Sequence, residues 1–156
     1  MRDNQKQLFI DQAKSVYRKF TLSEREIVGT DIILTGSSIM NFLKDTKEII
    51  IMAATLGFGV DRQIDAAGKI SLSDALALDM AANDAINDIC NQLQAELAQK
   101  YSIGQGRFSC GYGDLPLDIQ PQILNALDAT KAIGLYCNES YLLIPQKSVT
   151  AFIKII

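Results

Sequence analysis

The spacing of apolar residues changes along the chain, and each spacing predicts a type of element. Steps of three and four residues run over 5–20, 72–100 and 119–131, and they predict three helices. Ser71 precedes the longest of these segments with the spacing of a capping box, so we expect that helix to begin there. Gly134 follows the third segment and is expected to end its helix.

Other segments are short, apolar or alternating, which is typical of strands. The β-branched run 48–54 predicts a buried strand, and 31–34 predicts a shorter one. The segments 141–144 and 148–154 flank a proline-containing turn and are expected to form a hairpin. Helices mixed with few strands favour an α+β fold over a doubly wound sheet. Because no repeat or linker divides the chain, we expect a single domain over 1–156.

The longest predicted helix carries one continuous seam with a polar interruption. The eight seam positions share one helix face: Leu72, Leu76, Asp79, Asn83, Ile86, Cys90, Leu93 and Leu97. A carboxylate and an amide on a buried face need hydrogen-bond partners. Two alternatives stay open for Asp79 and Asn83: they bind a nearby loop of the protein, or they face a ligand.

Composition narrows the class of protein. With 48% hydrophobic and 21% charged residues among 156, the chain is typical of a soluble globular protein. Its net charge of −3 leaves no basic stripe for nucleic acid. The run Ile49–Ala54 is too short to span a bilayer, and 1–6 lacks the apolar core of a signal peptide. We therefore expect a cytoplasmic protein that binds neither nucleic acid nor membrane.

Residue types that are rare or missing exclude much chemistry. The chain has no histidine, so it contains no Ser-His-Asp triad and no imidazole base. Its three cysteines are widely spaced and form no CxxC pair, which argues against a disulfide framework or a zinc site. We expect no metal ligands and no catalytic side chain, so a cofactor or a partner would supply any reaction chemistry.

The segment Arg107–Pro116, with the sequence RFSCGYGDLP, concentrates binding chemistry in ten residues. Glycines permit a sharp turn or a close approach of a ligand. The guanidinium of Arg107 is a planar fork for a carboxylate or phosphate, and Tyr112 offers a flat face with a polar tip. The alternatives are a surface arginine paired with an acid and a half-buried aromatic ring. Their coincidence predicts a small-ligand site.

Known nucleotide loops do not fit. Gly57 and Gly59 follow a predicted strand, but Arg62 stands where a dinucleotide loop has its third glycine. Gly104 and Gly106 fail in the same way, and no Walker A sequence is present. A tight turn from strand to helix is the better interpretation of 55–59.

Three segments, in order, resemble a known family. They are Ile50–Gly57 with Val60 and Asp61, then Arg107–Asp118, which fits the pattern RxxxGYxxxP, and finally Asn138–Thr150. Together they resemble the activation domain of cobalamin-dependent methionine synthase, including its short stand-alone relatives. The resemblance covers about 30–153, and the middle motif is the specific one.

The resemblance implies both a fold and a function. The fold is α+β, with a mostly antiparallel sheet, a long central helix and flanking helices. The function is binding of S-adenosylmethionine (AdoMet) in the reactivation of a cobalamin-dependent methyltransferase. The cobalamin is carried by a partner chain, such as the methyltransferase or a corrinoid protein, and a separate reductase supplies the electron that restores methylcobalamin from the cob(II) state.

The resemblance also places six residues at the ligand: Arg107, Gly111, Tyr112, Asp114, Asn83 and Asp79. Arg107 matches the arginine that holds the AdoMet carboxylate, and Gly111 with Tyr112 matches the turn along the ligand. Asp114 falls where backbone lines the pocket. Asn83 aligns with a ligand-facing glutamate, and Asp79 is its supporting neighbour.

Three departures from the family bear on this prediction, and two of them, Asn83 and the end of the chain at Ile156, favour an alternative. Cys110 replaces the usual proline before Gly-Tyr, and Asn83 removes a carboxylate near a cationic sulfonium. Larger members also continue past the position of Ile156 and contribute another tyrosine. The alternative is a shortened docking module for a corrinoid protein that no longer binds AdoMet. An ordinary AdoMet-dependent methyltransferase is a weaker option, because the glycine-rich first loop is missing.

Overall fold

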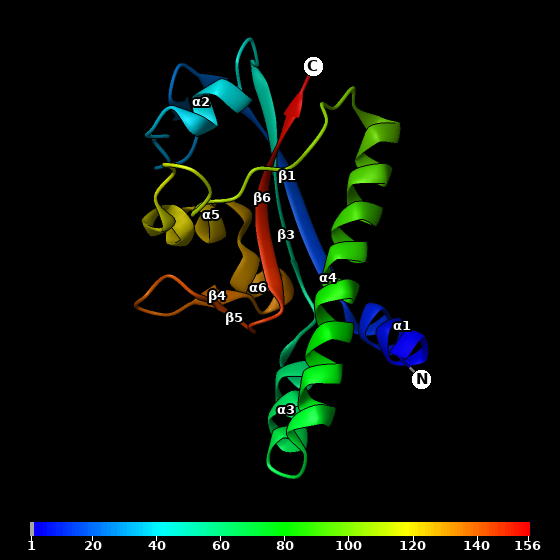
Figure 1. Cartoon of the computed structure of the whole chain (residues 1–156). Coiled ribbons are helices and arrows are strands. Elements are labelled where there is room, and N and C mark those ends of the chain that lie inside the picture. Colours follow the sequence, from blue (N-terminus) through cyan, green and yellow to red (C-terminus); the bar gives the residue numbers. More distant parts are fainter. Residues whose placement is uncertain (1) are drawn as a thin grey trace.

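The computed structural model describes residues 2–156 and consists of an antiparallel sheet between two groups of helices (Figure 1). The sheet contains β1 (Lys14–Ser23), β2 (Glu26–Ile27), β3 (Glu48–Thr55) and β6 (Ser148–Ile155), in the order β2-β1-β3-β6. A separate two-stranded sheet pairs β4 (Tyr136–Cys137) with β5 (Leu143–Ile144). All pairings between these strands are antiparallel, which confirms the α+β prediction and excludes the parallel order of a Rossmann domain within 2–156.

One group of helices covers one face of the sheet. It contains α1 (Arg2–Gln12), α3 (Phe58–Gly68) and α4 (Leu72–Lys100). The other face carries α2 (Ser38–Phe42), a 3₁₀ turn (Leu117–Ile119), α5 (Gln120–Leu127) and α6 (Ala129–Ile133). In Figure 1 α4 runs the whole length of the sheet and extends beyond it, where it packs with α3. This is the predicted long helix with flanking helices.

The strand β3 carries apolar side chains on both of its faces, because a hydrophobic cluster lies on each side of the sheet. Ile49, Ile51 and Ala53 belong to the cluster with α5 and α6. Ile50, Met52 and Ala54 belong to the cluster with α1 and α4. A strand that is buried on both faces shows a continuous apolar run rather than alternation. The sequence prediction for 48–54 was therefore correct for this physical reason.

Several predicted elements were wrong. The helix expected over 5–20 ends at Gln12, and 14–21 pairs residue by residue with β3. Val16, Tyr17 and Phe20 fit the helical spacing by coincidence, but aromatic and β-branched residues also suit a strand, and pairing with β3 decides between the two. The segment 31–34 forms only an isolated bridge, between Ile33 and Glu26.

The expected hairpin at the end of the chain is also wrong. β6 pairs with β3, and β5 pairs with β4 instead. The strand partners β3 and β6 lie about a hundred residues apart in the chain, so their pairing leaves no local signal in the sequence.

The helix expected over 119–131 is broken at Asp128, which has a positive φ of 51°, so α5 and α6 are separate.

The seam of α4 is correct only in its second half. Ile86, Cys90, Leu93 and Leu97 are buried, whereas Leu72 is 72% exposed and Leu76 is 56% exposed. The buried residues in the first half are alanines: Ala75, Ala81, Ala82 and Ala85. Because α1 and α3 pack against this part of α4, small side chains face them. The seam therefore rotates away from Asp79 and Asn83, which are not buried.

Candidate functional site

The segment Arg107–Pro116, the 107–116 loop, lies along the free edge of β6. Phe108 and Phe152 exchange two backbone hydrogen bonds, of 3.0 and 2.7 Å. The loop then leaves the sheet and closes with a bond of 2.9 Å from the N–H of Gly111 to the carbonyl of Leu115. Gly111 has φ of 91° and Gly113 has φ of 54°, values that L side chains rarely adopt. The predicted turn is thus present, and both glycines are needed for it.

The guanidinium of Arg107 is held by α4 through neutral groups. Its Nη1 donates to Asn91 Oδ1 at 2.8 Å and to Gln94 Oε1 at 2.9 Å, and its Nη2 donates to Asn87 Oδ1 at 3.3 Å. The Gln94 amide in turn donates to the carbonyl of Gly106 at 3.0 Å. No carboxylate of the described residues pairs with Arg107. The alternative of an arginine neutralised by an acid is excluded, and its positive charge is uncompensated.

Tyr112 stands at the tip of the loop and is 58% exposed. Its ring meets Phe108 edge to face at a centroid distance of 5.9 Å, and Phe108 lies 5.5 Å from Phe42. The aromatic contacts hold one edge of the tyrosine, which leaves the other side of the ring open to a ligand. It is not the half-buried structural ring that was the alternative.

Asp114 uses its carboxylate to hold the start of α2. Its Oδ2 accepts the N–H of Ser37 at 2.8 Å and the Ser37 hydroxyl at 3.1 Å, and its Oδ1 accepts the N–H of Ser38 at 2.9 Å. The two backbone N–H groups hold the pKa of Asp114 well below its ordinary value of 3.8. The carboxylate therefore fixes the loop to the start of α2.

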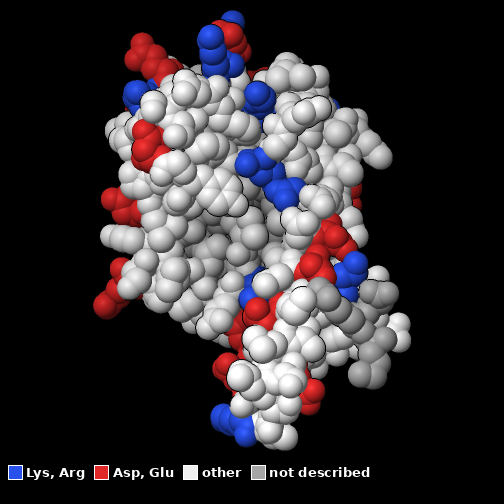
Figure 2. Space-filling view, viewed as in Figure 1, with Lys and Arg blue, Asp and Glu red and all other residues white. Residues whose placement is uncertain are grey.

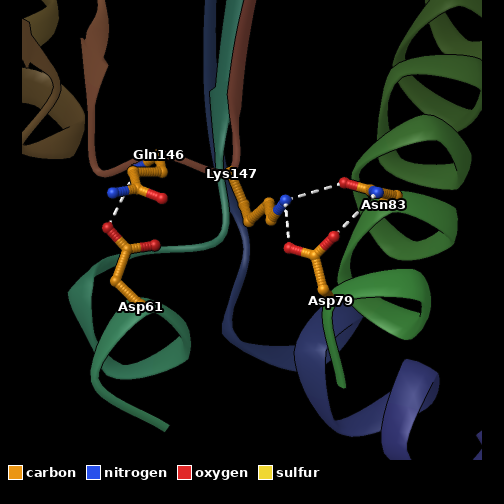
Figure 3. A network of polar contacts seen from close by, with 5 residues as sticks. All are labelled: Asp61, Asp79, Asn83, Gln146 and Lys147. Atoms are coloured by element: carbon orange, nitrogen blue, oxygen red, sulfur yellow. Dashed lines mark hydrogen bonds and ion pairs between the residues drawn. The ribbon is translucent and has the colours of Figure 1, made fainter. Parts of the chain in front are cut away.

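Asp79 and Asn83 both bind Lys147, in the turn before β6 (Figure 3). The Lys147 ammonium lies 2.7 Å from Asp79 Oδ1 and donates to Asn83 Oδ1 at 2.9 Å, and the Asn83 amide donates to Asp79 Oδ2 at 3.4 Å. The structure thus shows the first alternative, in which the pair holds a loop of the protein. Contact with a ligand stays a prediction for both residues.

The same turn is tied to α3 by Asp61. The N–H of Gln146 donates to Asp61 Oδ2 at 2.9 Å, as Figure 3 shows. The other carboxylate oxygen, Oδ1, is buried without a hydrogen-bond partner among the described residues. Both α3 and α4 therefore hold the turn that leads into β6, from two sides.

A cavity of about 190 Å³ lies between the 107–116 loop, the first residues of β6 and the start of α5. Figure 2 shows that the face carrying these elements is hollowed, with a mostly uncharged floor. The polar residues lining the cavity are Ser109, Gln120, Ser148 and Thr150. Sequence reasoning missed Gln120, which lies outside the three resembling segments, and assigned no role to Lys147 within the third, because both residues bind partners far away in the chain.

A larger cavity, of about 680 Å³, lies between α1, α3 and α4. Its lining is mainly alanine, leucine and isoleucine, with Asp74 as its acidic residue. It lacks a group of convergent polar side chains, so we place the candidate site at the smaller cavity. Within 2–156 no cluster of three or more His, Cys, Asp or Glu residues is suited to a metal ion, and no helix is long and apolar enough to cross a membrane.

Cys110 lines the candidate cavity but is nearly buried. Burial raises the pKa of its thiol to about 11, far above the usual range. A thiol with so high a pKa is almost entirely protonated at neutral pH and is a weak nucleophile. Cys110 therefore contributes packing at the turn rather than reactivity.

The fold and the site define an α+β domain with a small, uncharged cavity beside the 107–116 loop, at the edge of an antiparallel sheet. Among solved structures, the chain is similar to the crystal structure of the MetH reactivation domain bound to AdoHcy, with a TM-score of 0.70 and 15% identity. The alignment covers 92% of this chain and 58% of that one. No protein-family model and no curated protein matches the sequence. The similarity to the solved MetH reactivation domain confirms the predicted activation-domain fold.

Proposed function

We propose that this chain binds AdoMet and supports the reactivation of a cobalamin-dependent methyltransferase, as one folded domain over 1–156. The observation that carries the proposal is the 107–116 loop, which combines Arg107, a cation bound only to neutral groups, with an exposed Tyr112 that lines the cavity. A solved domain with the same fold has AdoHcy bound, and AdoHcy is AdoMet without the transferred methyl group. Fold likeness supports this function, and the arrangement of the residues makes it specific.

Each residue has a distinct role in the proposal. Arg107 exchanges one of its amide partners on α4 for the ligand carboxylate, because a charged acceptor forms a stronger bond with a guanidinium than a neutral one. Gly111 lets the backbone approach the ligand, and the ring face of Tyr112 attracts the sulfonium. Asp114 keeps the loop in position from behind.

Asp79 and Asn83 enter the proposal as residues that position the turn at Lys147, with direct contact to the ligand as the alternative. The turn leads into Ser148, which lines the cavity. Stabilising it from α4 keeps that wall of the cavity in place. No side chain of the chain takes part in bond making.

The partner chain carries the cobalamin, and this cobalamin is the methyl acceptor of the reaction. Reductive methylation consumes one electron from a separate reductase and one methyl group, which leaves the sulfonium sulfur of AdoMet as AdoHcy forms. The chain binds and orients the methyl donor, and it leaves the donor's open side accessible to the partner. The exposed position of Tyr112 supports this arrangement.

Calorimetric titration with AdoHcy tests the ligand. We expect Arg107→Ala to weaken binding by about 10- to 150-fold, the loss of a hydrogen bond between charged groups. Arg62→Ala is the matched control, because it removes the same charge from the exposed surface of α3 and should leave binding unchanged. Equal affinities of the two variants for AdoHcy would show that Arg107 does not bind the ligand.

The reactivation role needs a second experiment. The chain, a cobalamin-binding domain of a methionine synthase, AdoMet and a chemical reductant are mixed, and the absorbance of methylcobalamin is followed. Formation of methylcobalamin that requires the chain and falls in Arg107→Ala supports the proposal. Absence of methylcobalamin, with AdoHcy bound, overturns the reactivation role and leaves the ligand.

A second candidate function is a docking module for a corrinoid protein without AdoMet binding. It is favoured by one observation: Arg107, Asp79 and Asn83 already have partners inside the chain. This alternative is supported if the chain associates with a cobalamin-binding domain but gives no heat of binding when it is titrated with AdoHcy.

A further inference from the structure

Gln120 is a buried amide with one unused end in the candidate cavity. It is 4% exposed and lies at the first position of α5. Its Oε1 accepts the hydroxyl of Thr150 at 2.6 Å, which holds this end of the amide against β6. Its Nε2 has no hydrogen-bond partner among the described residues and keeps some accessible surface. Because Gln120 lines the cavity, this donor is available to a ligand there.

The serine hydroxyls beside Gln120 already donate their hydrogens within the chain, so they can only accept a hydrogen bond from a ligand. Ser109 gives its hydrogen to the carbonyl of Thr150 at 2.6 Å. The Ser148 hydroxyl donates to acceptors of the chain as well, since its Oγ lies 2.7 Å from the carbonyl oxygen of Pro145 and 2.7 Å from Thr55 Oγ1. Because Gln120 as a residue is only 4% exposed, the accessible surface that its Nε2 keeps is confined, and the cavity that Gln120 lines is where this N–H can meet a ligand. The matching ligand atom must be an acceptor.

The shape and charge of the cavity restrict the ligand further. Its volume of about 190 Å³ is below the range of about 300–1,000 Å³ for a whole drug-sized ligand, so it holds one ring system rather than a complete molecule. Leu143 and Val149 provide apolar walls, and none of the lining side chains is charged. The carboxylate and the amine of AdoMet are therefore unsuited to it, whereas a flat neutral base fits.

We infer that Gln120 is the specificity residue for the adenine base of the bound ligand. A carboxamide places a donor and an acceptor side by side in one plane, and this pair matches the ring nitrogen and exocyclic amine of adenine. The second lone pair of Oε1 remains for the exocyclic amine, since Thr150 uses only one. The inference rests on the proposed AdoMet binding but concerns a different part of the ligand from Arg107.

The test needs a variant that removes the amide without leaving a buried hydroxyl unpaired. Gln120→Met alone strands the hydroxyl of Thr150, so the double variant Gln120→Met/Thr150→Val is used, in which both partners become apolar. Thr150→Val is the matched control, because it removes the same hydroxyl and keeps the amide. Thermal unfolding of both variants checks that each is folded.

Three ligands are titrated by calorimetry: AdoHcy, its analogue with hypoxanthine in place of adenine (S-inosylhomocysteine), and adenosine. We expect the wild-type chain to prefer AdoHcy over the analogue by about 5- to 150-fold, the range for a two-bond contact with a base. Thr150→Val, which keeps the amide but removes the hydroxyl that holds it, should retain part of this preference. The double variant should lose this preference. In nitrogen NMR spectra, the side-chain amide signals of Gln120 should shift with adenosine alone.

The outcomes separate this inference from the proposed function. AdoHcy binding that depends on Arg107 but shows no base preference, and no shift at Gln120, overturns the adenine contact and leaves AdoMet binding intact. Adenosine binding that depends on Gln120, with no effect of Arg107→Ala on AdoHcy, supports the adenine contact and overturns the proposed amino-acid end of the site. Failure of the wild-type chain to bind any of the three ligands overturns both.

Discussion

The ion pair between Lys147 and Asp79 is expected to stabilise the turn before β6, and a double-mutant cycle measures by how much. The ammonium lies 2.7 Å from the carboxylate, and the Lys147 side chain is only 17% exposed. Asp79 is 41% exposed, so the range for solvent-exposed pairs applies, about 0.2–1 kcal/mol. The covered lysine and its bond of 2.9 Å to Asn83 place the coupling in the upper half, at about 0.5–1 kcal/mol.

The cycle consists of Lys147→Met, Asp79→Asn and the double variant, with urea unfolding as the assay. Lys147→Met should lower the free energy of unfolding by about 1 kcal/mol and Tm by about 2–4 °C. At 1 M salt the coupling should shrink, since exposed charges are screened. Lys69→Met combined with Asp79→Asn is the control and should be additive, because Lys69 has no ion pair among the described residues. A coupling indistinguishable from that control would refute the reasoning.

The same variants separate the two alternatives for Asp79 and Asn83. If the pair positions the turn, Lys147→Met and Asp79→Asn release the same segment and weaken AdoHcy binding by similar factors. If Asp79 and Asn83 contact the amine of the ligand, Lys147 is a competing cation. Asp79→Asn then weakens binding while Lys147→Met strengthens it. Opposite signs would overturn the positioning role that we propose.

Three further predictions follow from the 107–116 loop. Gly36→Ala should destabilise the fold by more than Gly29→Ala, because both glycines have a positive φ but only at Gly36 would a Cβ meet Asp114, at 2.6 Å; equal losses in urea unfolding would contradict this. The Tm difference between the wild-type chain and Asp114→Asn should be constant from pH 7 to about 4.5 and should narrow toward pH 2. The lowered pKa of Asp114 stabilises the folded chain at pH values above the ordinary pKa of 3.8, and this stabilisation is lost as the pH falls below that value. Cys110 should resist a thiol reagent at pH 8, since burial raises its pKa to about 11, and rapid labelling of Cys110 in the folded chain would refute this.

The parts of the fold that the sequence predicted correctly are those with strong local patterns. Ser71 accepts the N–H of Asp74 and begins α4, as the capping spacing indicated. The turn from Thr55 to Gly59 also joins strand to helix as expected, with Gly57 at a positive φ of 88°. In both cases the decisive interactions join residues within four positions of each other.

The site was only partly predictable. The motif around Arg107 and Tyr112 was found because its residues are contiguous, and the structure places both at the surface of one loop. Lys147 binds α4 across more than sixty positions, and Gln120 binds Thr150 across thirty. Spacing within the sequence contains no information about such contacts, so the partners of Asp79 and the donor in the cavity came only from the structure.

The sequence by itself determined the α+β class, the long helix, the buried central strand and the glycine turn of the 107–116 loop, because each depends on periodicity, capping or glycine conformation over a few residues. The tertiary structure decided that β6 pairs with β3, that 14–23 is a strand, and that the first half of α4 turns alanines inward. These outcomes depend on which surfaces meet when the chain folds. Packing and strand pairing between distant segments contribute more free energy there than local preference does.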